Sequence, residues 1–454
     1  MNIKYNSKKI QKGDTFIALK TNNDGHKYIN DAIKNGATKV VAEYGSYPVE
    51  TLLVDNTKEY LVKYLYENYY QEIKDLKLIG ITGTNGKTTT CMLLHNMLNM
   101  LGRKTAYIGT NGFYINKFIK ELPNTTPEIL DIYELLIEAK KEGCEFVCIE
   151  ASSHGLAQNR LENLKFDYAI FTNLTHEHLG YHKTMKNYAL AKQKLFTMLR
   201  NNKYAIINND DNYKNYFILK ENNNITYSLN NGNYYVKEYK ITTQNNIFTV
   251  VNNNKEYTFT TKLLGKHNIY NSLASIIVLN KIGYSFEEIN NVLTIVSGPK
   301  GRMENISYNN NNIIIDYAHT PDGIANVLNT TKELHPNKII TIVGCGGGTG
   351  SDRTKRSEMG NLVLSLSDKT IFTNDNPRDE DPNQIINDLL KEKINNNYII
   401  ELDRKKAINK GINMLTNNDI LLILGKGHEN YQIIGNNKTY FNDKETVLEI
   451  TKEK

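Results

Sequence analysis

The sequence has few cysteines, and their spacing fits neither a redox motif nor a disulfide framework. Only four of the 454 residues are cysteine, and Cys91, Cys144, Cys148 and Cys345 include no CxxC pair. Small secreted scaffolds are much denser in cysteine, and thioredoxin-type sites need two of them close together. We therefore expect four reduced thiols in a cytoplasmic protein.

Long apolar runs and a large excess of one charge are also missing. No apolar stretch approaches the roughly 18 residues of a membrane-spanning helix, and the opening MNIKYNSKKIQKGD is not a signal peptide. The 55 basic and 49 acidic residues leave a net charge of +6. Nucleic-acid-binding domains usually concentrate basic residues on one face, whereas an anionic small molecule explains mild basicity equally well. We expect a soluble monomer with no membrane insertion and no nucleic-acid partner.

The length and the rhythm of apolar segments predict an α/β protein of three domains. A chain of 454 residues is too long for one hydrophobic core, and strands alternate with helices along most of it. We predict a small N-terminal α/β domain (1–76), a central P-loop α/β ATPase domain (77–301) and a C-terminal Rossmann-like α/β domain (302–454). Residues 213–262 lack a long helix and predict a β-rich excursion.

The most informative segment is IGITGTNGKTTT, residues 79–90. An apolar strand runs into a glycine-rich turn whose N–H groups would cradle phosphate oxygens, and the next helix adds its positive end. Lys87 would reach the outer phosphates and the Thr88 hydroxyl would hold Mg²⁺. A strict Walker A motif needs glycine where Ile81 stands, so the loop is a variant of that motif. It predicts nucleotide binding through Gly83, Thr84, Asn85, Gly86, Lys87, Thr88 and Thr89.

Two further motifs in the central domain carry groups that could bind a metal. Glu150 opens EASSHGL at the end of a predicted parallel strand, where it could bind Mg²⁺ or be a solvated strand end. TNLTHEHLGYH supplies His176, His178 and His182. Their H-x-H-x3-H spacing includes no carboxylate or cysteine at a familiar zinc spacing. We favour one histidine in a magnesium site over a zinc centre.

Two helical patterns leave alternatives open. Lys192 and Lys194 lie on an amphipathic helix and could simply be solvated cations. Asn268 and Asn271 lie one helical turn apart, so their side chains point the same way. Paired amides can read the edge of adenine, but the two could equally be a cap and a surface residue.

Three polar patches end predicted strands of the last domain: DYAH (316–319), TNDNPR (373–378) and GKGHE (425–429). A basic loop, DRTKR (352–356), adds to them. The carboxyl ends of parallel strands are the edge where such folds bind ligands. Arg356, Arg378 and Glu429 offer two guanidinium groups for carboxylates and one carboxylate for an ammonium. The pattern predicts a site for an amino acid with more than one charged end.

Taken in order, these motifs resemble those of the Mur ligase family, most closely the members that add diaminopimelate to UDP-N-acetylmuramoyl-L-alanyl-D-glutamate. The match covers nearly the whole chain and includes GTNGKTT, NTTP, EASSHGL, TNLTHEHLGYH, AKQKLF, INNDD, GKHNIYNSLA, GRME, DYAHTPD, GCGG, DNPR and GKGHE. The resemblance implies ATP-dependent amide formation in peptidoglycan precursor synthesis, with Mg²⁺ as cofactor. The D-Glu γ-carboxylate would attack the γ-phosphate of ATP, and the amino group of meso-diaminopimelate would displace phosphate from the acyl phosphate.

The resemblance also implies a role for individual residues. Lys192, as a carbamate, would hold Mg²⁺ with Thr88, Glu150 and His178, and Lys87, Lys192, Glu150 and His178 would be catalytic. Asn271, Arg302 and Asp316 match positions near the adenine and ribose of ATP. Ser7, Asn124, Thr125, Thr126, Ser152, Gln158 and Arg160 match positions that bind the UDP-linked substrate. Arg356, Asp375, Asn376, Pro377, Arg378, Gly425 and Glu429 match positions around diaminopimelate.

The sequence departs from the family pattern at two places, and other functions are kept as alternatives. NSK at residues 6–8 stands where relatives usually have DSR, and the loop before Arg356 is longer than usual. DNPR carries the specificity, because relatives that add L-lysine lack its arginine. The alternatives are a ligase for L-lysine, another diamino acid or folate-linked glutamate, and a nucleotide-dependent switch without ligase activity.

Overall fold

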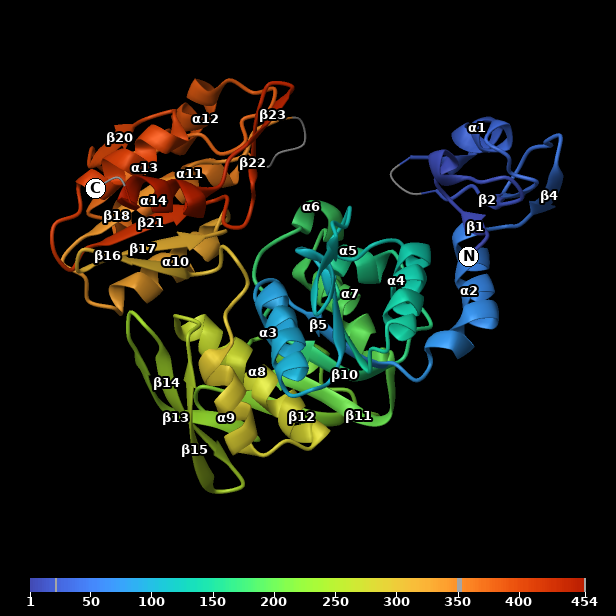
Figure 1. Ribbon diagram of the computed structural model, residues 1–454, viewed down its shortest axis with the longest axis horizontal. Helices are drawn as coiled ribbons and strands as arrows, with labels where there is room; N and C mark the ends of the chain where they lie inside the picture. Colours follow the sequence, from blue (N-terminus) through green and yellow to red (C-terminus); the bar gives the residue numbers. More distant parts are fainter. Residues whose placement is uncertain (21–22, 349–352, 453–454) are drawn as a thin grey trace.

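The computed structural model describes residues 1–20, 23–348 and 353–452. Its strands form sheets of four, eleven and six strands that follow one another along the chain, and a separate two-stranded hairpin. In Figure 1 the N-terminal part (blue) and the C-terminal part (orange to red) lie on opposite sides of the central part. The α/β fold predicted from the sequence is confirmed. The exact domain boundaries, near residues 76 and 301, remain a prediction.

The first sheet is small and entirely parallel. Its order is β1 (Ile3–Lys4), β2 (Thr15–Ile17), β3 (Lys39–Ala42) and β4 (Glu50–Leu53). The helices are α1 (Ile29–Lys34) and α2 (Thr57–Ile73). The Asn56 side chain caps α2 by accepting from the N–H groups of Lys58 and Glu59. α2 packs against α4 (Ile129–Lys141) and leads into the second sheet.

The central sheet has eleven strands, and the predicted β-rich excursion belongs to it. The order is β15-β14-β13-β12-β11-β10-β5-β9-β6-β7-β8. The bounds are β5 (Lys77–Thr82), β6 (Thr105–Gly109), β7 (Gly112–Ile115), β8 (Lys117–Lys120), β9 (Phe146–Glu150), β10 (Phe166–Phe171), β11 (Leu199–Asn208), β12 (Asn223–Ser228), β13 (Tyr234–Ile241), β14 (Asn246–Asn252) and β15 (Lys255–Thr261). The strands from β12 through β6 run parallel, whereas β14, β15, β7 and β8 add antiparallel pairs.

Helices cover both faces of this sheet. They are α3 (Lys87–Met100), α4, α5 (Ser153–Ala157), α6 (Leu179–His182), α7 (Met185–Thr197), α8 (Lys266–Ile282) and α9 (Phe286–Ile295). Successive side chains of a strand point to opposite faces. In β9, Val147 and Ile149 join the core under α4 and α7, whereas Phe146 and Cys148 join the core under α3, α8 and α9. Burial on both faces explains why this strand reads as a continuous apolar run.

The third sheet has the order β16-β17-β21-β18-β19-β20. The strands are β16 (Glu304–Tyr308), β17 (Asn311–Asp316), β18 (Ile339–Val343), β19 (Lys369–Phe372), β20 (Tyr398–Ile400) and β21 (Ile420–Leu424), and all except β16 are parallel to their neighbours. α10 (Pro321–Lys332), α11 (Lys355–Leu366) and α12 (Pro382–Leu389) cover one face, and α13 (Arg404–Asn413) and α14 (Asp443–Lys452) the other. A hairpin of β22 (Tyr431–Ile434) and β23 (Asn437–Tyr440) follows β21.

The prediction of four free thiols is confirmed. All four cysteines are buried, free thiols. Within residues 1–20, 23–348 and 353–452, no helix is both long and apolar enough to cross a membrane.

Candidate functional site

A cavity of about 1080 Å³ lies where the central sheet meets the start of the C-terminal domain. It gathers most residues predicted to bind ATP or the UDP-linked substrate. These are Thr84, Asn85, Gly86, Lys87, Thr88, Thr89, Asn124, Thr125, Thr126, Glu150, Ser152, Gln158, Arg160, His178, Lys192, Asn271, Arg302 and Asp316. Ser7 and the seven residues predicted to bind diaminopimelate do not line it.

The glycine-rich loop joins β5 to α3 in the expected way. Gly86 caps the helix with a φ of 85°. A Cβ atom there would lie 2.5 Å from Oδ1 of Asn271 on α8, so both the backbone conformation and the close approach require glycine. The same amide oxygen accepts from the Thr90 hydroxyl at 3.2 Å. The loop and α8 are therefore fitted to one another.

Two lysines converge on one carbonyl of the loop. The Nζ of Lys87 donates to the Gly83 and Thr84 oxygens at 2.8 and 2.7 Å, and the Nζ of Lys192 donates to the Gly83 oxygen at 2.7 Å. Burial lowers the pKa of the Lys192 amine well below its ordinary value, and the charge of Lys87 lowers it further. Lys192 is 1% exposed, so it is not the solvated cation that its spacing allowed.

Glu150 ends β9 and is fully buried, which rules out a solvated strand end. Its Oε2 accepts from the hydroxyls of Thr88 at 2.9 Å and Thr110 at 3.1 Å. Its Oε1 accepts from the Tyr107 hydroxyl and, at 3.0 Å, from the Thr110 N–H. A carboxylate next to a threonine hydroxyl beside a phosphate loop is the hard oxygen donor set that Mg²⁺ prefers. These residues fit a magnesium ion.

The histidines do not form a zinc centre. Among the described residues, no three His, Cys, Asp or Glu side chains come together as a metal site. His176 is exposed, and the Nε2 of His182 lies 3.0 Å from the Ser153 hydroxyl. His178 lines the cavity and packs edge-on against His154, with ring centroids 4.8 Å apart. The preference for one histidine near the nucleotide loop is compatible with this arrangement.

The residues predicted to hold the UDP-linked substrate form a hydrogen-bonded group at the end of β9. The Thr126 hydroxyl donates to the Glu150 backbone oxygen at 2.6 Å and accepts from the Ser152 N–H at 3.0 Å. Arg160 donates to the backbone oxygen of Thr126 at 2.8 Å and forms an ion pair with Glu128 at 2.9 Å. Ser7 is buried in the N-terminal domain instead.

Asn268 and Asn271 of α8 are hydrogen-bonded to each other inside the protein. The Nδ2 of Asn271 donates to the Oδ1 of Asn268 at 2.9 Å, and both side chains are buried. The interpretation as a cap and a surface residue is wrong. Nearby, Asp316 accepts from the Met303 and Ala318 N–H groups, each at 2.7 Å.

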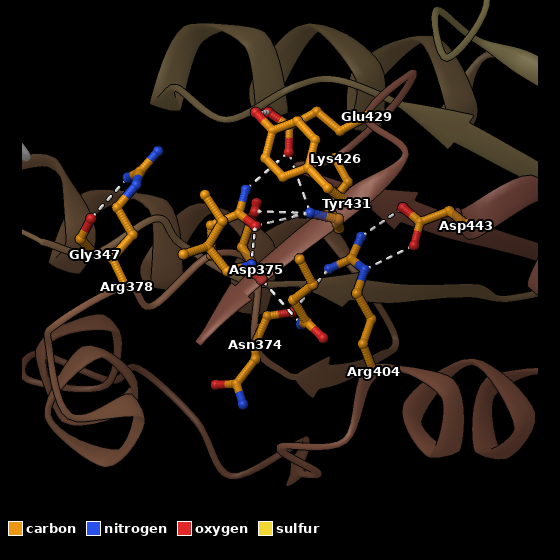
Figure 2. Close-up of polar contacts among 12 residues, drawn as sticks. Gly347, Asn374, Asp375, Arg378, Arg404, Lys426, Glu429, Tyr431 and Asp443 are labelled. Carbon is orange, nitrogen blue, oxygen red and sulfur yellow. Dashed lines mark hydrogen bonds and ion pairs between the residues drawn. The ribbon is translucent and has the colours of Figure 1, made fainter. Parts of the chain in front are cut away.

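The predicted amino-acid site lies at the carboxyl ends of β19 and β21. Asp375, Asn376 and Glu429 are brought together there, and a Cβ on Gly425 would lie 2.6 Å from Asp375 Oδ2. Arg378 is exposed and lies to one side, where its guanidinium donates to the Gly347 oxygen at 2.8 Å (Figure 2). Its backbone bonds to Ile433 and Gly435 fix the loop against β22.

Arg356 does not face this site, which argues against its predicted role. Its side chain is fully buried and ion-paired with Glu380 at 2.7 Å and Asp388 at 2.8 Å. A guanidinium already neutralised by two carboxylates is a poor clamp for a third. The predicted basic loop begins at residue 352, which lies outside the described residues.

Sequence reasoning missed several polar residues of both sites. Tyr107 and Thr110 hold Glu150, and Lys426, inside the GKGHE motif, holds Asn376 and Glu429. Lys426 belongs to the GKGHE motif, which was identified from the sequence. Its burial could not be read from that motif.

Two family models match the chain. Residues 81–279 match the Mur ligase middle domain, and residues 301–427 match the Mur ligase, glutamate ligase domain. Among curated proteins, one from Fusobacterium nucleatum subsp. nucleatum is 40% identical over 98% of this chain and 92% of its own. Another, from Clostridium perfringens, is 39% identical over 100% and 95%. Both are named UDP-N-acetylmuramoyl-L-alanyl-D-glutamate–2,6-diaminopimelate ligase.

Solved structures agree with this fold. A structure of a UDP-N-acetylmuramoyl-L-alanyl-D-glutamate–2,6-diaminopimelate ligase superposes with a TM-score of 0.71 at 31% identity, over 99% of this chain and 94% of that one. A MurF ligase from Thermotoga maritima in complex with ADP has a TM-score of 0.70 at 19% identity, over 99% and 97%. With full-length relatives near 40% identity, the chain belongs to the Mur ligase family.

Proposed function

We propose that this chain is an ATP-dependent ligase that joins meso-diaminopimelate to the D-Glu of UDP-N-acetylmuramoyl-L-alanyl-D-glutamate through an acyl phosphate. The observation that carries the proposal is the pairing of two sites. A phosphate-loop cavity contains Glu150 and Lys192, and a separate strand-end site combines Glu429 with an exposed Arg378.

The cavity suits the first half of the reaction, in which a carboxylate attacks a phosphate. Two anions must be brought together, and preorganised cations and N–H groups lower that cost. Lys87 lies in the loop and donates to its carbonyl oxygens, and Arg160 lines the same cavity near the predicted substrate residues. In this proposal, Lys87 faces the phosphates and Arg160 orients the UDP-linked substrate.

Mg²⁺ would be held by Glu150, Thr88 and His178, with Lys192 contributing as a carbamate. A bound Mg²⁺ would neutralise charge on the phosphate oxygens. The low pKa of the Lys192 amine supports the carbamate, because CO₂ reacts with the neutral amine. Addition of CO₂ to the neutral amine would release one proton and leave an anionic carbamate, whose oxygens could bind Mg²⁺.

The strand-end site suits the second half, in which an amine attacks the acyl phosphate. The Glu429 carboxylate, 16% exposed, can accept from an ammonium group. Arg378 can bind a distal carboxylate, which diaminopimelate has and L-lysine lacks. Asp375, Asn376, Pro377 and Gly425 form the surrounding loops, and we withdraw Arg356 from the ligands. A cytoplasmic, monomeric enzyme remains part of the proposal.

The deciding experiment is an amino-acid specificity assay. Phosphate release from ATP is measured with the UDP-linked dipeptide and either meso-diaminopimelate or L-lysine. We expect diaminopimelate to be strongly preferred. Preference for L-lysine would overturn the specificity, and ATP hydrolysis independent of the UDP-linked substrate would support a nucleotide-dependent switch instead.

A further inference from the structure

A buried group of charged side chains lies beneath the predicted amino-acid site. Figure 2 shows Lys426 between Asp375 and Glu429, with Arg404 and Asp443 beside them. The side chains of Lys426, Arg404 and Asp443 have no exposed surface, so none of them can touch a substrate from its position. Buried charges are costly unless they are paired and hydrogen-bonded. The partners of these three residues therefore indicate what the group holds in place.

Arg404 ties two loops together. It is the first residue of α13, and its Nε and Nη2 donate to the two carboxylate oxygens of Asp443, both at 2.7 Å. Its Nη1 reaches the Asn374 oxygen at 3.3 Å, and its Nη2 reaches the Leu424 oxygen at 3.1 Å. These carbonyls lie at the ends of β19 and β21, which β18 separates in the sheet. The backbone ladder cannot join the two loops, and Arg404 does.

Lys426 fixes the orientation of an amide. The Oδ1 of Asn376 accepts from Lys426 Nζ at 3.2 Å and from the Ile433 N–H at 3.0 Å. With the oxygen held by two donors, the Asn376 NH₂ group donates to Glu429 Oε2 at 2.8 Å. Lys426 donates to that same oxygen at 3.1 Å. The internal contacts of Asn376 and Lys426 therefore fall on one oxygen of Glu429. The other, Oε1, accepts a long bond of 3.4 Å from the Tyr431 hydroxyl, and it can accept a further donor.

Carboxylates outnumber cations in this group. Arg404 and Lys426 face three carboxylates, those of Asp443, Asp375 and Glu429. Of these carboxylates, Glu429 is the most exposed, at 16% of its side chain against 8% for Asp375 and none for Asp443. The most accessible carboxylate of the group therefore lies at the open end, where it can accept from an incoming ammonium.

We propose that Arg404 and Lys426 are positioning residues that set amino-acid selectivity by holding Asn376 and Glu429 in one geometry. This inference rests on the proposed function, because it takes Asn376 and Glu429 as contacts of the incoming diamino acid. Loosening the group should weaken recognition of that substrate alone, since the residues proposed to bind ATP and the UDP-linked substrate line the other cavity. A residue needed only for folding would lower activity without such a preference.

The first test removes the charge of Lys426. Lys426→Met is compared with Lys438→Met, because both lysines lie over the Tyr431 ring, at 5.5 and 4.1 Å, and Lys438 is exposed. For Lys426→Met we expect the KM for diaminopimelate to rise about tenfold or more, as for loss of a charged hydrogen bond. The KM for ATP should change less than about twofold, and the preference for diaminopimelate over L-lysine should fall. Lys438→Met should match wild type.

The second test removes a whole ion pair, so that no buried charge is left without its partner. Arg404→Met/Asp443→Leu is compared with Lys405→Met/Glu449→Leu, which removes an exposed pair of 2.8 Å between the same two helices. Only the first double variant should raise the KM for diaminopimelate selectively. Thermal unfolding of each variant identifies any that fails to fold. Lys426→Gln, which keeps a hydrogen-bond donor, then replaces Lys426→Met.

The outcomes separate the two proposals. If the wild-type enzyme does not use diaminopimelate, the proposed function is overturned. If wild type uses it and the folded variants change the KM values for ATP and diaminopimelate equally, or change neither, the positioning inference alone is overturned.

Discussion

At the scale of single residues, Lys192 carries the sharpest expectation. Burial lowers the pKa of its amine well below the ordinary value, and this raises the fraction of neutral amine that can react with CO₂. Lys192→Ala should lower turnover by about two orders of magnitude or more, comparable to losing one transition-state contact. Wild-type activity in CO₂-depleted buffer should rise on adding bicarbonate.

The matched control is Lys194→Ala on the same helix, because the Lys194 ammonium bonds to Asn159 at 3.0 Å, away from the loop. Steady-state turnover of both variants is the measurement. Undiminished turnover of Lys192→Ala would contradict the carbamate hypothesis.

Arg378 should determine affinity for the amino acid. Its guanidinium is exposed, and its backbone is fixed against β22 with a φ of 53°. Arg378→Ala should raise the KM for diaminopimelate about 10- to 100-fold, the range for losing a charge-assisted bond, while the KM for ATP stays nearly constant. The KM of Arg378→Lys for diaminopimelate should lie between those of wild type and Arg378→Ala, since lysine keeps the charge but lacks the bidentate fork. Equal changes in both KM values would place the residue elsewhere.

The geometry of the candidate site could be predicted from the sequence where a motif is contiguous, but not where burial decides. The loop of Gly86 and Lys87 could be predicted because its chemistry follows from neighbouring residues. Arg356 could not, since only the fold shows that Glu380 and Asp388 neutralise it. Arg404 and Asp443 are 39 positions apart, and no local pattern indicates that they form a pair.

At the scale of elements, α3 supplies a pH-dependent contribution to stability. His95 on α3 is buried near Tyr107 and Tyr114, and burial lowers its pKa to about 4. Between pH 6.5 and 4 the unfolded chain binds a proton there that the folded chain does not. The free energy of unfolding should therefore fall as pH drops through this window.

Urea unfolding at several pH values measures this effect. His95→Gln should reduce the slope of the unfolding free energy against pH by up to about 1.4 kcal/mol per pH unit, which corresponds to one proton. Exposed His335 has a φ of 52°, which asparagine tolerates, so His335→Asn is the control and should keep the slope. An unchanged slope for His95→Gln would contradict the assignment.

The elements themselves were the most predictable level of structure. Strands such as β5, β9 and β21 are short apolar runs bounded by polar or glycine residues, and helices such as α8 end at a glycine, Gly283. The sheet order was not predictable, because β13 to β15 reveal no partner in their own sequence. Their joining β12 to extend the central sheet depends on pairing between distant segments.

At the scale of the whole molecule, the two predicted sites do not share one cavity. For an amine to attack an acyl phosphate, the reacting atoms must approach to about 3–3.5 Å. We therefore expect the C-terminal domain to close toward the central one when substrates bind. The radius of gyration from X-ray scattering should fall when a non-hydrolysable ATP analogue, the UDP-linked dipeptide and diaminopimelate are present together.

Each ligand alone serves as the control, and we expect smaller changes than with the full set. A contact already spans the two domains, because the Asn85 amide in the loop donates to Asp322 of α10 at 2.7 Å. Scattering that stays constant when all three ligands are present together would contradict domain closure.

The bridge that Arg404 builds across the end of β18 limits how this enzyme could be re-engineered. Residues 374–378, 424–429 and the starts of α13 and α14 depend on one another through Arg404, Asp443 and Lys426. If the DNPR segment alone were exchanged, the new loop would have to pack against Arg404 and Lys426, whose positions suit the original loop. A transplanted preference for another amino acid should therefore require all of these segments as one block.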